Sequence, residues 1–519
     1  MYCSRNLKGR GDTTMGEFLN NLNNFIWGLP FIIFVMIVGL YFSARGGFFT
    51  IAHFGHVMKQ TLGSLMSKES NTKEKGQVSP FEAVCVAIGG CVGCANIAGV
   101  ATAMMTGGYG AIFWMWLWAF FGMMVKLVEV TLGCYYRSKN ERGEYYGGPM
   151  YYMEKGIGRE LGLKIGAPLA ILFSIFFCLQ SLQGSQGFTI AEVLHASFGF
   201  NMIVVVAIYS AVVLYLIWSG STRAVNFATK CVPFMCIVYL LAGIVLIVLN
   251  VENLPTAIYN IFHDAFTGSA AFGGFLGASV TQAMNSGVSR SMNSNEAGMG
   301  SSPLVHGSAD CVHPVRQGLW GSFEVFVDTL IICSITGLSV ACTGVMDSGL
   351  TGATLTIEAY KSLFGQGAAA YIGIMAVMFG LTTTTGYFIY YQTVIGYILR
   401  YKPVLRDRII SIFKVYFPLM NVVVTSYIVL TGQDATMFWT IVSLVTAGPV
   451  FFNLIALVIL HNKFFAIFKD YLARYMGKGK VDPNFNIFYE DDPKIAAEEE
   501  AVREELRKKV AAELASHGK

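Results

Sequence analysis

The chain has 519 residues, of which 54% are hydrophobic and only 13% are charged, and its formal net charge is +4. Soluble globular proteins carry about 25% charged residues, so this composition excludes a soluble multidomain protein and indicates a polytopic membrane protein. The small positive charge gives no reason to expect nucleic-acid binding.

Apolar stretches long enough to cross a bilayer recur along most of the chain. They lie at 25–44, 80–105, 109–134, 167–198, 202–218, 231–249, 270–292, 318–342, 367–398, 410–430 and 435–460. We therefore predict an all-α polytopic membrane protein with about 11 transmembrane helices. A polar segment, 1–24, precedes the first span. The tail, 461–519, is rich in charged residues near its end and predicts a short exposed helix.

The distribution of basic residues predicts the orientation in the membrane. If the first span runs from outside to inside, 29 of the 36 Lys and Arg residues fall in alternate loops and in the tail. An excess of Lys and Arg marks the cytoplasmic side of membrane proteins. We therefore expect a cell-membrane protein with its N-terminus outside and its C-terminus in the cytoplasm.

A glycine-rich run, 89–99, interrupts the span 80–105. Irregular backbone at the depth of the hydrocarbon survives only where it lines a cavity or is buried in protein. The ends of the two half-helices would present N–H groups to an anion and carbonyl groups to a cation. We therefore predict a substrate site at Gly93, Cys94, Ala95 and Asn96, with a carboxylate on the free N–H groups.

A second glycine-rich run, which includes Gly273, Gly274 and Gly277, lies five spans later in the segment 270–292. Interruptions at corresponding positions of two halves indicate inverted repeats around a site at the membrane midplane. On this interpretation 80–249 and 270–460 are two five-helix repeats, and carbonyl groups of the second break meet the substrate ammonium. Small residues at Ala95 and Gly277 predict a short substrate side chain. The alternative is that these glycines only allow close helix packing.

Other chemically active residue types have simpler interpretations. The 11 cysteines lie mostly within spans, which argues against a disulfide framework. Cys91 and Cys94 have the CxxC spacing of redox and metal pairs, but no second pair or nearby histidine accompanies them, so we interpret them as packing residues. His306 and His313 lie in a connecting loop that we expect to be solvated.

Ionisable residues within spans are costly and are usually functional. Lys126 and Glu129 lie three residues apart on one helical face, so we expect them to neutralise each other in a structural role. Asp328 and Glu192 are less easily paired, and either could carry a proton.

Several runs resemble motifs of one known family. They are 96–99 (Asn-Ile-Ala-Gly), 147–152 (Gly-Gly-Pro-Met-Tyr-Tyr) and 294–298 (Ser-Asn-Glu-Ala-Gly). These runs are similar to those of the alanine or glycine:cation symporters, which are bacterial and archaeal amino-acid transporters. The resemblance extends over most of the chain. It implies a LeuT-like fold, a 5+5 inverted repeat, preceded by one extra helix at 25–44.

The chain departs from the family pattern in the region where ligands would bind. The run 93–96 reads Gly-Cys-Ala-Asn where the family usually has Gly-Thr-Gly-Asn. In the third helix of the fold Gln183 fits the family, whereas Ser185 and Gln186 replace an Asn-Ser pair. In the eighth helix, 382–387 reads Thr-Thr-Thr-Thr-Gly-Tyr in place of Ser-Thr-Ile-Leu-Gly-Trp. These departures leave the particular substrate open.

The resemblance also implies an ion site. In this fold sodium binds between the first and eighth helices to backbone carbonyls and two hydroxyls, and these ligands correspond here to Gly89, Val92, Thr382 and Thr383. Gln183 would give the substrate a side-chain hydrogen bond. Asn96 would either ligate a second ion or orient the broken helix. No cofactor is expected beyond sodium as the coupling ion.

These patterns predict sodium-coupled symport of a small neutral amino acid, such as alanine or glycine, by alternating access. A carrier of another small solute and a proton-coupled carrier are the alternatives. A channel or a membrane enzyme is disfavoured because neither HExxH nor GxSxG occurs, and the chain has no Walker motif for ATP-driven pumping. The expected partners are the amino acid, sodium and the lipid bilayer, and not nucleic acid.

Overall fold

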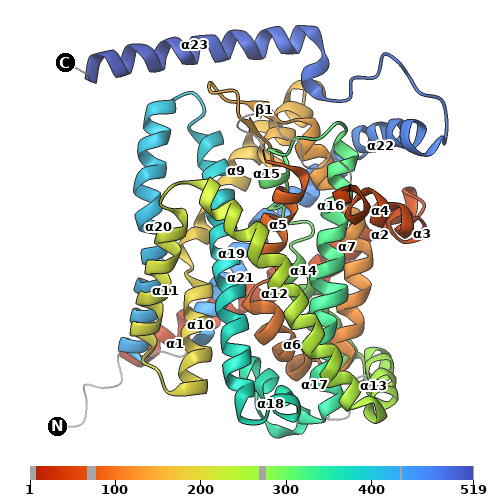
Figure 1. Cartoon of the computed structure of the whole chain (residues 1–519), viewed down its shortest axis with the longest axis vertical. Helices are drawn as coiled ribbons and strands as arrows, with labels where there is room; N and C mark the ends of the chain where they lie inside the picture. Colours follow the sequence, from red (N-terminus) through yellow and green to blue (C-terminus); the bar gives the residue numbers. More distant parts are fainter. Residues whose placement is uncertain (1–7, 67–77, 268–275, 433–434, 518–519) are drawn as a thin grey trace.

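Long helices running up and down form the body of the protein (Figure 1). The computed structural model describes residues 8–66, 78–267, 276–432 and 435–517. One end of the bundle carries α23 (Pro493–His517) and the antiparallel hairpin of β1 (Ser138–Lys139) and β2 (Tyr145–Tyr146). The other end carries α13 (Leu254–Thr267) and α18 (Gly352–Phe364). We call these the α23 end and the α18 end.

The described residues contain eight helical stretches that are long and apolar enough to cross a membrane. A ninth span is formed by two helices that meet at an angle of 49°. Two more expected spans do not reach this standard, because α11 (Met202–Ile217) is short and α14 (Leu276–Asn295) is polar. The all-α membrane fold is confirmed, whereas length and composition of the helices do not confirm the count of 11.

The helices after residue 78 follow the order expected for two halves. The first half comprises α5 (Pro80–Cys91), a π-helical turn (Ala95–Gly99), α6 (Val100–Gly107), α7 (Gly110–Tyr135), α9 (Gly166–Leu179), α10 (Ser185–Phe198), α11 and α12 (Ser221–Leu249). The second half comprises α14, α15 (Pro303–His306), α16 (Pro314–Val325), a π-helical stretch (Phe326–Cys333), α17 (Ser334–Thr343), α19 (Ala368–Ile398), α20 (Pro403–Thr431) and α21 (Ala435–Ile459).

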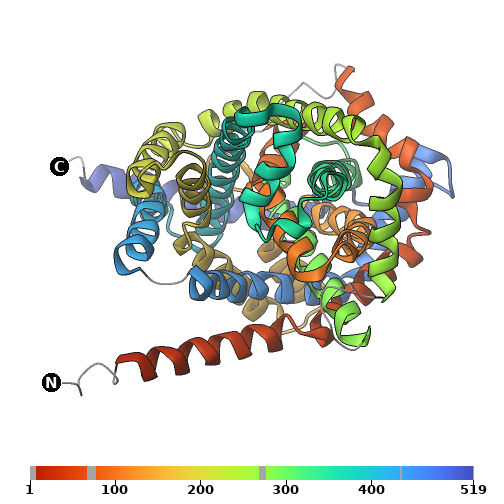
Figure 2. The same cartoon turned by 90° about the horizontal axis from the view of Figure 1, so that it is seen from below.

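Before the two halves come α1 (Lys8–Ile26) and α2 (Leu29–Arg45), and residues 16–45 of these helices form the first of the eight stretches. Shorter elements are α3 (Phe49–Ala52), α4 (Phe54–Gln60), α8 (Pro149–Tyr151) with a π-helical extension (Tyr152–Glu160), and α22 (His461–Met476). Figure 2 shows α1 along the outside of the bundle. It is joined to α21 by a hydrogen bond of 2.8 Å from Thr440 to Asn20.

The first broken span begins and ends at residues that sequence chemistry explains. Ser79 and Glu82 form a capping box, in which each side chain bonds the backbone N–H of the other, and Pro80 occupies the first helical turn. The helix α5 ends at Cys91 because Val92 has an extended backbone, with φ −77° and ψ 89°. The interruption therefore falls within the predicted glycine-rich run.

The second interruption lies at 296–302, between α14 and α15. There Glu296 has a φ of 55°, and Gly298 and Gly300 have φ of 88° and 80°, so the chain turns through left-handed conformations that a helix cannot contain. The glycine run expected to interrupt the span 270–292 is only partly described. Gly277 lies in the first turn of α14, and Gly273 and Gly274 lie outside the described residues, so a break at that run stays a prediction.

The segment 295–317, expected to be a solvated loop, is largely buried. His306 and His313 are each 0% exposed. His306 Nδ1 is 2.6 Å from the Gln317 amide, and His313 Nε2 is 3.3 Å from Asp470 on α22. Burial lowers the pKa of His313 to about 4. These histidines are therefore packing residues of the α23 end and not loop residues.

A buried charge network joins three long helices. Lys126 Nζ on α7 lies 3.6 Å from Glu129 and 3.1 Å from Glu324 of α16, and all three side chains are fully buried. Glu129 also accepts a hydrogen bond of 2.9 Å from Asn453 of α21. Lys126 thus neutralises Glu129, as predicted, and also Glu324 on the neighbouring helix α16.

We expect the substitution Lys126→Met to lower the thermal stability of the purified protein. Removing one partner of a buried ion pair costs about 3–5 kcal/mol, because the remaining charges stay desolvated without compensation. Unfolding in detergent, followed by the melting temperature, measures the loss. Lys361→Met is the matched control, since Lys361 forms an exposed pair with Glu358 that contributes little. Equal melting temperatures for the two variants would contradict the account.

Candidate functional site

Asn96 holds the first break together. Its Oδ1 accepts a hydrogen bond of 2.8 Å from the N–H of Gly93, and its backbone carbonyl accepts one of 2.8 Å from the Thr336 hydroxyl. Its Nδ2 donates to Asp328 at 2.7 Å. Asn96 is fully buried. The side chain therefore supplies a partner that the interrupted backbone lacks, which favours the orienting role over direct ligation of an ion.

Asp328 connects this break with the end of α14. Its carboxylate accepts hydrogen bonds from Asn96, from Ser294 at 2.9 Å and from Thr329 at 2.8 Å. Asp328 is 0% exposed, and among the described residues it forms no ion pair. A carboxylate held at membrane depth by hydrogen-bond donors alone is an expected place for a proton or a cation. Glu192, the other candidate, is exposed on α10.

Oxygen atoms of α5 and α19 converge beside the first break. The Thr383 hydroxyl lies 3.0 Å from the carbonyl oxygen of Gly89, 3.4 Å from that of Val92 and 2.9 Å from that of Phe379 on its own helix. The Thr382 hydroxyl bonds Phe379 and Met378 of its own helix and makes no hydrogen bond to α5. Three carbonyls and one hydroxyl form a set of oxygen ligands of the kind that hard cations prefer.

The glycines of the first break allow this approach of the two helices. A Cβ atom on Gly93 would lie 2.7 Å from Thr383 Oγ1, and one on Gly89 would lie 3.2 Å from Thr382 Cβ. Any larger residue at Gly93 would push α19 away from the carbonyls. The glycine run therefore explains both the interruption and the position of the oxygen cluster.

The two glutamines near α10 lie in different places. Gln186 Oε1 is 3.4 Å from the N–H of Cys94, at the start of the second half-helix. Gln183 instead points its amide at the Val442 carbonyl of α21, at 3.4 Å. The structure thus brings Gln186 to the break and turns Gln183 toward α21.

Exposure differs between the two halves of the first broken span. Residues 83–91 of α5 are all buried. Beyond the break, Ala95, Ala98, Thr102 and Met105 are partly exposed at helical spacing, on one face of the half that runs toward the α18 end. The segment 93–96 is therefore covered toward the α23 end, and the partly exposed face lies toward the α18 end.

Three residues near the site were absent from the sequence prediction. Phe379 contributes only a backbone carbonyl, so its side-chain type carries no signal. Gln186 was seen as a departure from the family pattern, but its direction depends on the turn between α9 and α10. Arg290 lies on α14 with its Nη1 2.4 Å from the position of a Cβ on Gly99. An arginine within an apolar segment was a signal available in the sequence.

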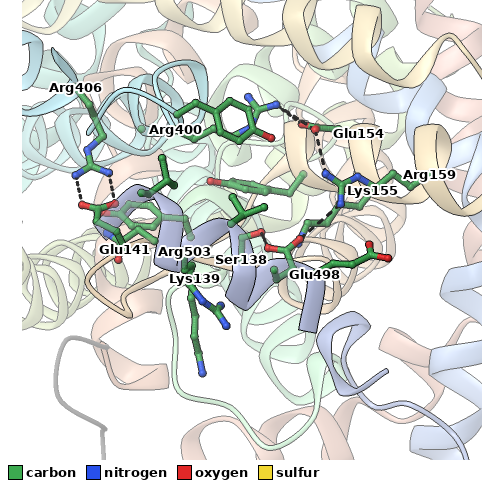
Figure 3. A pocket seen from close by; sticks show the side chains of 18 residues that line it. Ser138, Lys139, Glu141, Glu154, Lys155, Arg159, Arg400, Arg406, Glu498 and Arg503 are labelled. Atoms are coloured by element: carbon green, nitrogen blue, oxygen red, sulfur yellow. Dashed lines mark hydrogen bonds and ion pairs between the residues drawn. The ribbon is translucent and has the colours of Figure 1, made fainter. Parts of the chain in front are cut away.

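A separate cavity of about 450 Å³ lies at the α23 end (Figure 3). Ion pairs surround it. Arg406 binds Glu141 through two hydrogen bonds of 3.0 and 2.6 Å, and Lys155 lies 3.1 Å from Glu499 of α23. Burial would raise the pKa of Glu141, but the Arg406 guanidinium outweighs it and holds that pKa below its usual value. The cavity therefore lies within the attachment of α23.

The last helix of the tail, which we expected to be short and exposed, is attached to the bundle along one face. Leu506 of α23 is 7% exposed, and Arg507 donates a hydrogen bond of 2.9 Å to the carbonyl of Glu141. In α22, Phe464 and Tyr471 are fully buried. The tail is thus attached to the bundle through α22 and through one face of α23, while residues 477–484 and most of α23 are exposed.

Comparisons with known proteins agree with this architecture. The model of the sodium:alanine symporter family matches residues 12–486. The chain belongs to the sodium:alanine symporter family. The sodium/alanine symporter AgcS of Methanococcus maripaludis is 34% identical over 410 residues, which cover 77% of this chain and 87% of AgcS. The probable sodium/glutamine symporter GlnT of Bacillus subtilis is 32% identical over 470 residues, 90% of this chain and 92% of GlnT.

An uncharacterized transporter of Haemophilus influenzae is 36% identical over 471 residues, 89% of this chain and 97% of that protein. Among solved structures, a Na⁺-coupled sialic acid symporter matches with a TM-score of 0.51 and 10% identity, over 88% of this chain and 92% of that one. At such low sequence identity, the match supports a shared fold and nothing about the substrate. The LeuT-like fold is thereby confirmed, while the substrates for which these symporters are named differ.

We expect Gln186→Leu to weaken substrate binding more than Gln183→Leu. The first variant removes a polar group beside the Cys94 N–H, whereas the second removes a contact with α21. Loss of one hydrogen bond contributes about 1 kcal/mol, which corresponds to a rise of roughly fivefold in KM. Initial uptake rates in proteoliposomes measure both variants. A larger rise in KM for Gln183→Leu would reverse the assignment.

Proposed function

We propose that the protein is a sodium-coupled symporter of a small neutral amino acid, alanine-like or glycine-like, that works by alternating access. Family membership and the amino-acid carriers among its relatives support sodium-coupled amino-acid transport. The finer assignment rests on the site. Ala95 offers only a methyl group beside the N–H groups of the break, which leaves room for a short side chain and little need for polar recognition of it.

The observation that carries the proposal is the contact between Thr383 and the end of α5. The Gly89 carbonyl belongs to the last turn of a half-helix and the Val92 carbonyl to the residue that follows it, where the carbonyl end of the dipole favours a cation. The amide groups that begin the next half-helix favour an anion. A sodium ion and a carboxylate would therefore bind on opposite ends of the same break. Thr382 belongs to the proposed site as a neighbour of the Phe379 carbonyl.

Coupling follows from this shared break. Sodium bound between α5 and α19 would hold the first helix in the position in which its N–H groups meet the carboxylate. The negative carboxylate of the substrate would in turn balance the positive charge of the bound sodium ion. Each ligand then stabilises the arrangement that the other requires, and reciprocity of binding free energies is a thermodynamic necessity.

The proposed orientation puts the α23 end in the cytoplasm. The basic hairpin strand residue Lys139 and the basic residues of α22 and α23 lie at that end. The partly exposed face of α6 would then open to the outside, so the arrangement corresponds to access from the extracellular side.

Proton coupling at Asp328 is the second candidate. Its buried carboxylate forms no ion pair among the described residues and accepts hydrogen bonds from Asn96 and Ser294. Protonation of Asp328 would therefore change the hydrogen bonds at the first break and at the end of α14. Under this alternative a pH gradient in sodium-free buffer drives uptake in the unaltered protein and fails to do so in Asp328→Asn.

The direct test of sodium coupling compares two buried threonines of α19. We expect Thr383→Ala to raise the sodium concentration for half-maximal uptake by about tenfold, equivalent to about 1.4 kcal/mol, because one oxygen ligand is lost. Thr385→Ala is the matched control, since the Thr385 hydroxyl bonds only Leu381 and Thr382 of its own helix. The measurement is uptake of labelled L-alanine, glycine and L-glutamine in proteoliposomes over a range of sodium concentrations.

Equal sodium dependence in Thr383→Ala and the unaltered protein would reject the assignment of this oxygen cluster. Failure of the unaltered protein to take up any of the three amino acids would reject the proposed function itself. Faster uptake of L-glutamine than of L-alanine would keep amino-acid transport and overturn the proposed preference for a short side chain.

A further inference from the structure

Arg290 lies in the second half of α14, between the end of α6 and the first break. Four residues before it, Ser286 is 3.1 Å from the hydroxyl of Thr106 at the end of α6. Four residues after it, Ser294 bonds Asp328 beside the first break. The Arg290 side chain lies against Gly99, three residues beyond Asn96. The guanidinium is therefore about one helical turn from the break, on the side from which the break is approached.

This guanidinium has no counter-charge in the described part of the chain. Arg290 forms no hydrogen bond or ion pair there, and its side chain is partly exposed. Arginine stays protonated in proteins. A permanent charge in this position is costly unless water or an anion reaches it. Gly99 makes room for it, because a Cβ there would lie 2.4 Å from Nη1.

The surface of α14 around Arg290 is mostly polar. After Val280, its exposed or partly exposed residues are Thr281, Gln282, Met284, Asn285, Ser286, Ser289, Arg290 and Asn293, and only Met284 among them is apolar. Such a face does not suit lipid, so it borders a wet path. The Asn285 Oδ1 atom is buried without a hydrogen-bond partner among the described residues. The face thus offers a fixed cation and a free acceptor oxygen.

We propose that Arg290 binds the carboxylate of the incoming substrate before that carboxylate reaches the N–H groups at 94–96. This inference rests on the proposed function and deepens it. A planar guanidinium can hold a carboxylate through two parallel hydrogen bonds, which suits a first contact that must orient the molecule. The substrate ammonium then meets acceptor oxygens along the same face. Amines and amides that lack a carboxylate are rejected at this step.

The experiment uses initial uptake rates at saturating sodium, with whichever of L-alanine, glycine and L-glutamine the unaltered protein transports fastest. Arg290→Gln should raise KM at least tenfold and change the maximal rate by less than twofold. Arg290→Lys, which keeps the charge, should raise KM less than threefold. The control is Arg223→Gln, because Arg223 is an exposed arginine whose guanidinium contacts only Tyr215. Its KM should stay unchanged.

Chemical rescue separates a charge effect from a packing effect. Arg290→Cys is treated from outside with a methanethiosulfonate that adds either an aminoethyl or a sulfonatoethyl group, and the unaltered protein is treated in parallel. The positive group should restore most of the lost affinity, and the negative group should not. The melting temperature of the variant should stay within a few degrees of the unaltered protein.

If the unaltered protein takes up an amino acid, two results would overturn the role of Arg290 while leaving the proposed function standing. One is an unchanged KM in Arg290→Gln. The other is equal loss in the Lys and Gln variants with no rescue by the aminoethyl group, which would make Arg290 a packing residue. Absence of uptake of all three amino acids by the unaltered protein would instead overturn the proposed function and this inference with it.

Discussion

The hydrogen bonds of Asn96 are the constraint on which the rest of the site depends. A helix interrupted inside a membrane leaves backbone groups without partners, and hydrocarbon supplies none. Asn96 satisfies the Gly93 N–H with its oxygen and uses its amide to hold Asp328. The first break, the end of α14 and the π-helical stretch after α16 are thereby fixed relative to one another. The oxygen cluster around Thr383 and the face of α14 that carries Arg290 take their positions from this arrangement.

Buried charge is distributed so that the two ends of the bundle have different properties. Toward the α23 end, Lys126 neutralises Glu129 and Glu324, and ion pairs attach α23 to the π-helical extension of α8. Those charges are paired and packed. Between the first break and the α18 end, Arg290 has no hydrogen bond or ion pair in the described residues, on a mostly polar face of α14. Under the proposed function, the paired charges lie on the closed side and Arg290 lies on the side from which the substrate arrives.

Sequence predicted the first break well because glycine has a clear physical signature there. The family resemblance also directed attention to Thr383, whose hydroxyl lies among three carbonyls. The interruption at 296–302 escaped prediction for a physical reason. It is produced by left-handed backbone at Glu296, a residue type that rarely adopts it. The motif that contains Glu296 was recognised as a family signature without its geometry.

Side-chain direction was the other limit of prediction. Gln183 and Gln186 are three residues apart, but a short 3₁₀ turn and a left-handed Gly184 separate α9 from α10 and aim the two amides at different helices. Periodicity alone cannot supply that rotation. Burial of His313 likewise depends on packing of α22, which is distant in the sequence.

The central claim is that one break binds both the ion and the amino acid. Its most direct test is the initial rate of labelled sodium entry into proteoliposomes at zero membrane potential, with and without the transported amino acid outside. The account predicts that the amino acid accelerates sodium entry in a fixed ratio to its own uptake. Amino-acid uptake at an undiminished rate with no accompanying sodium entry would contradict it.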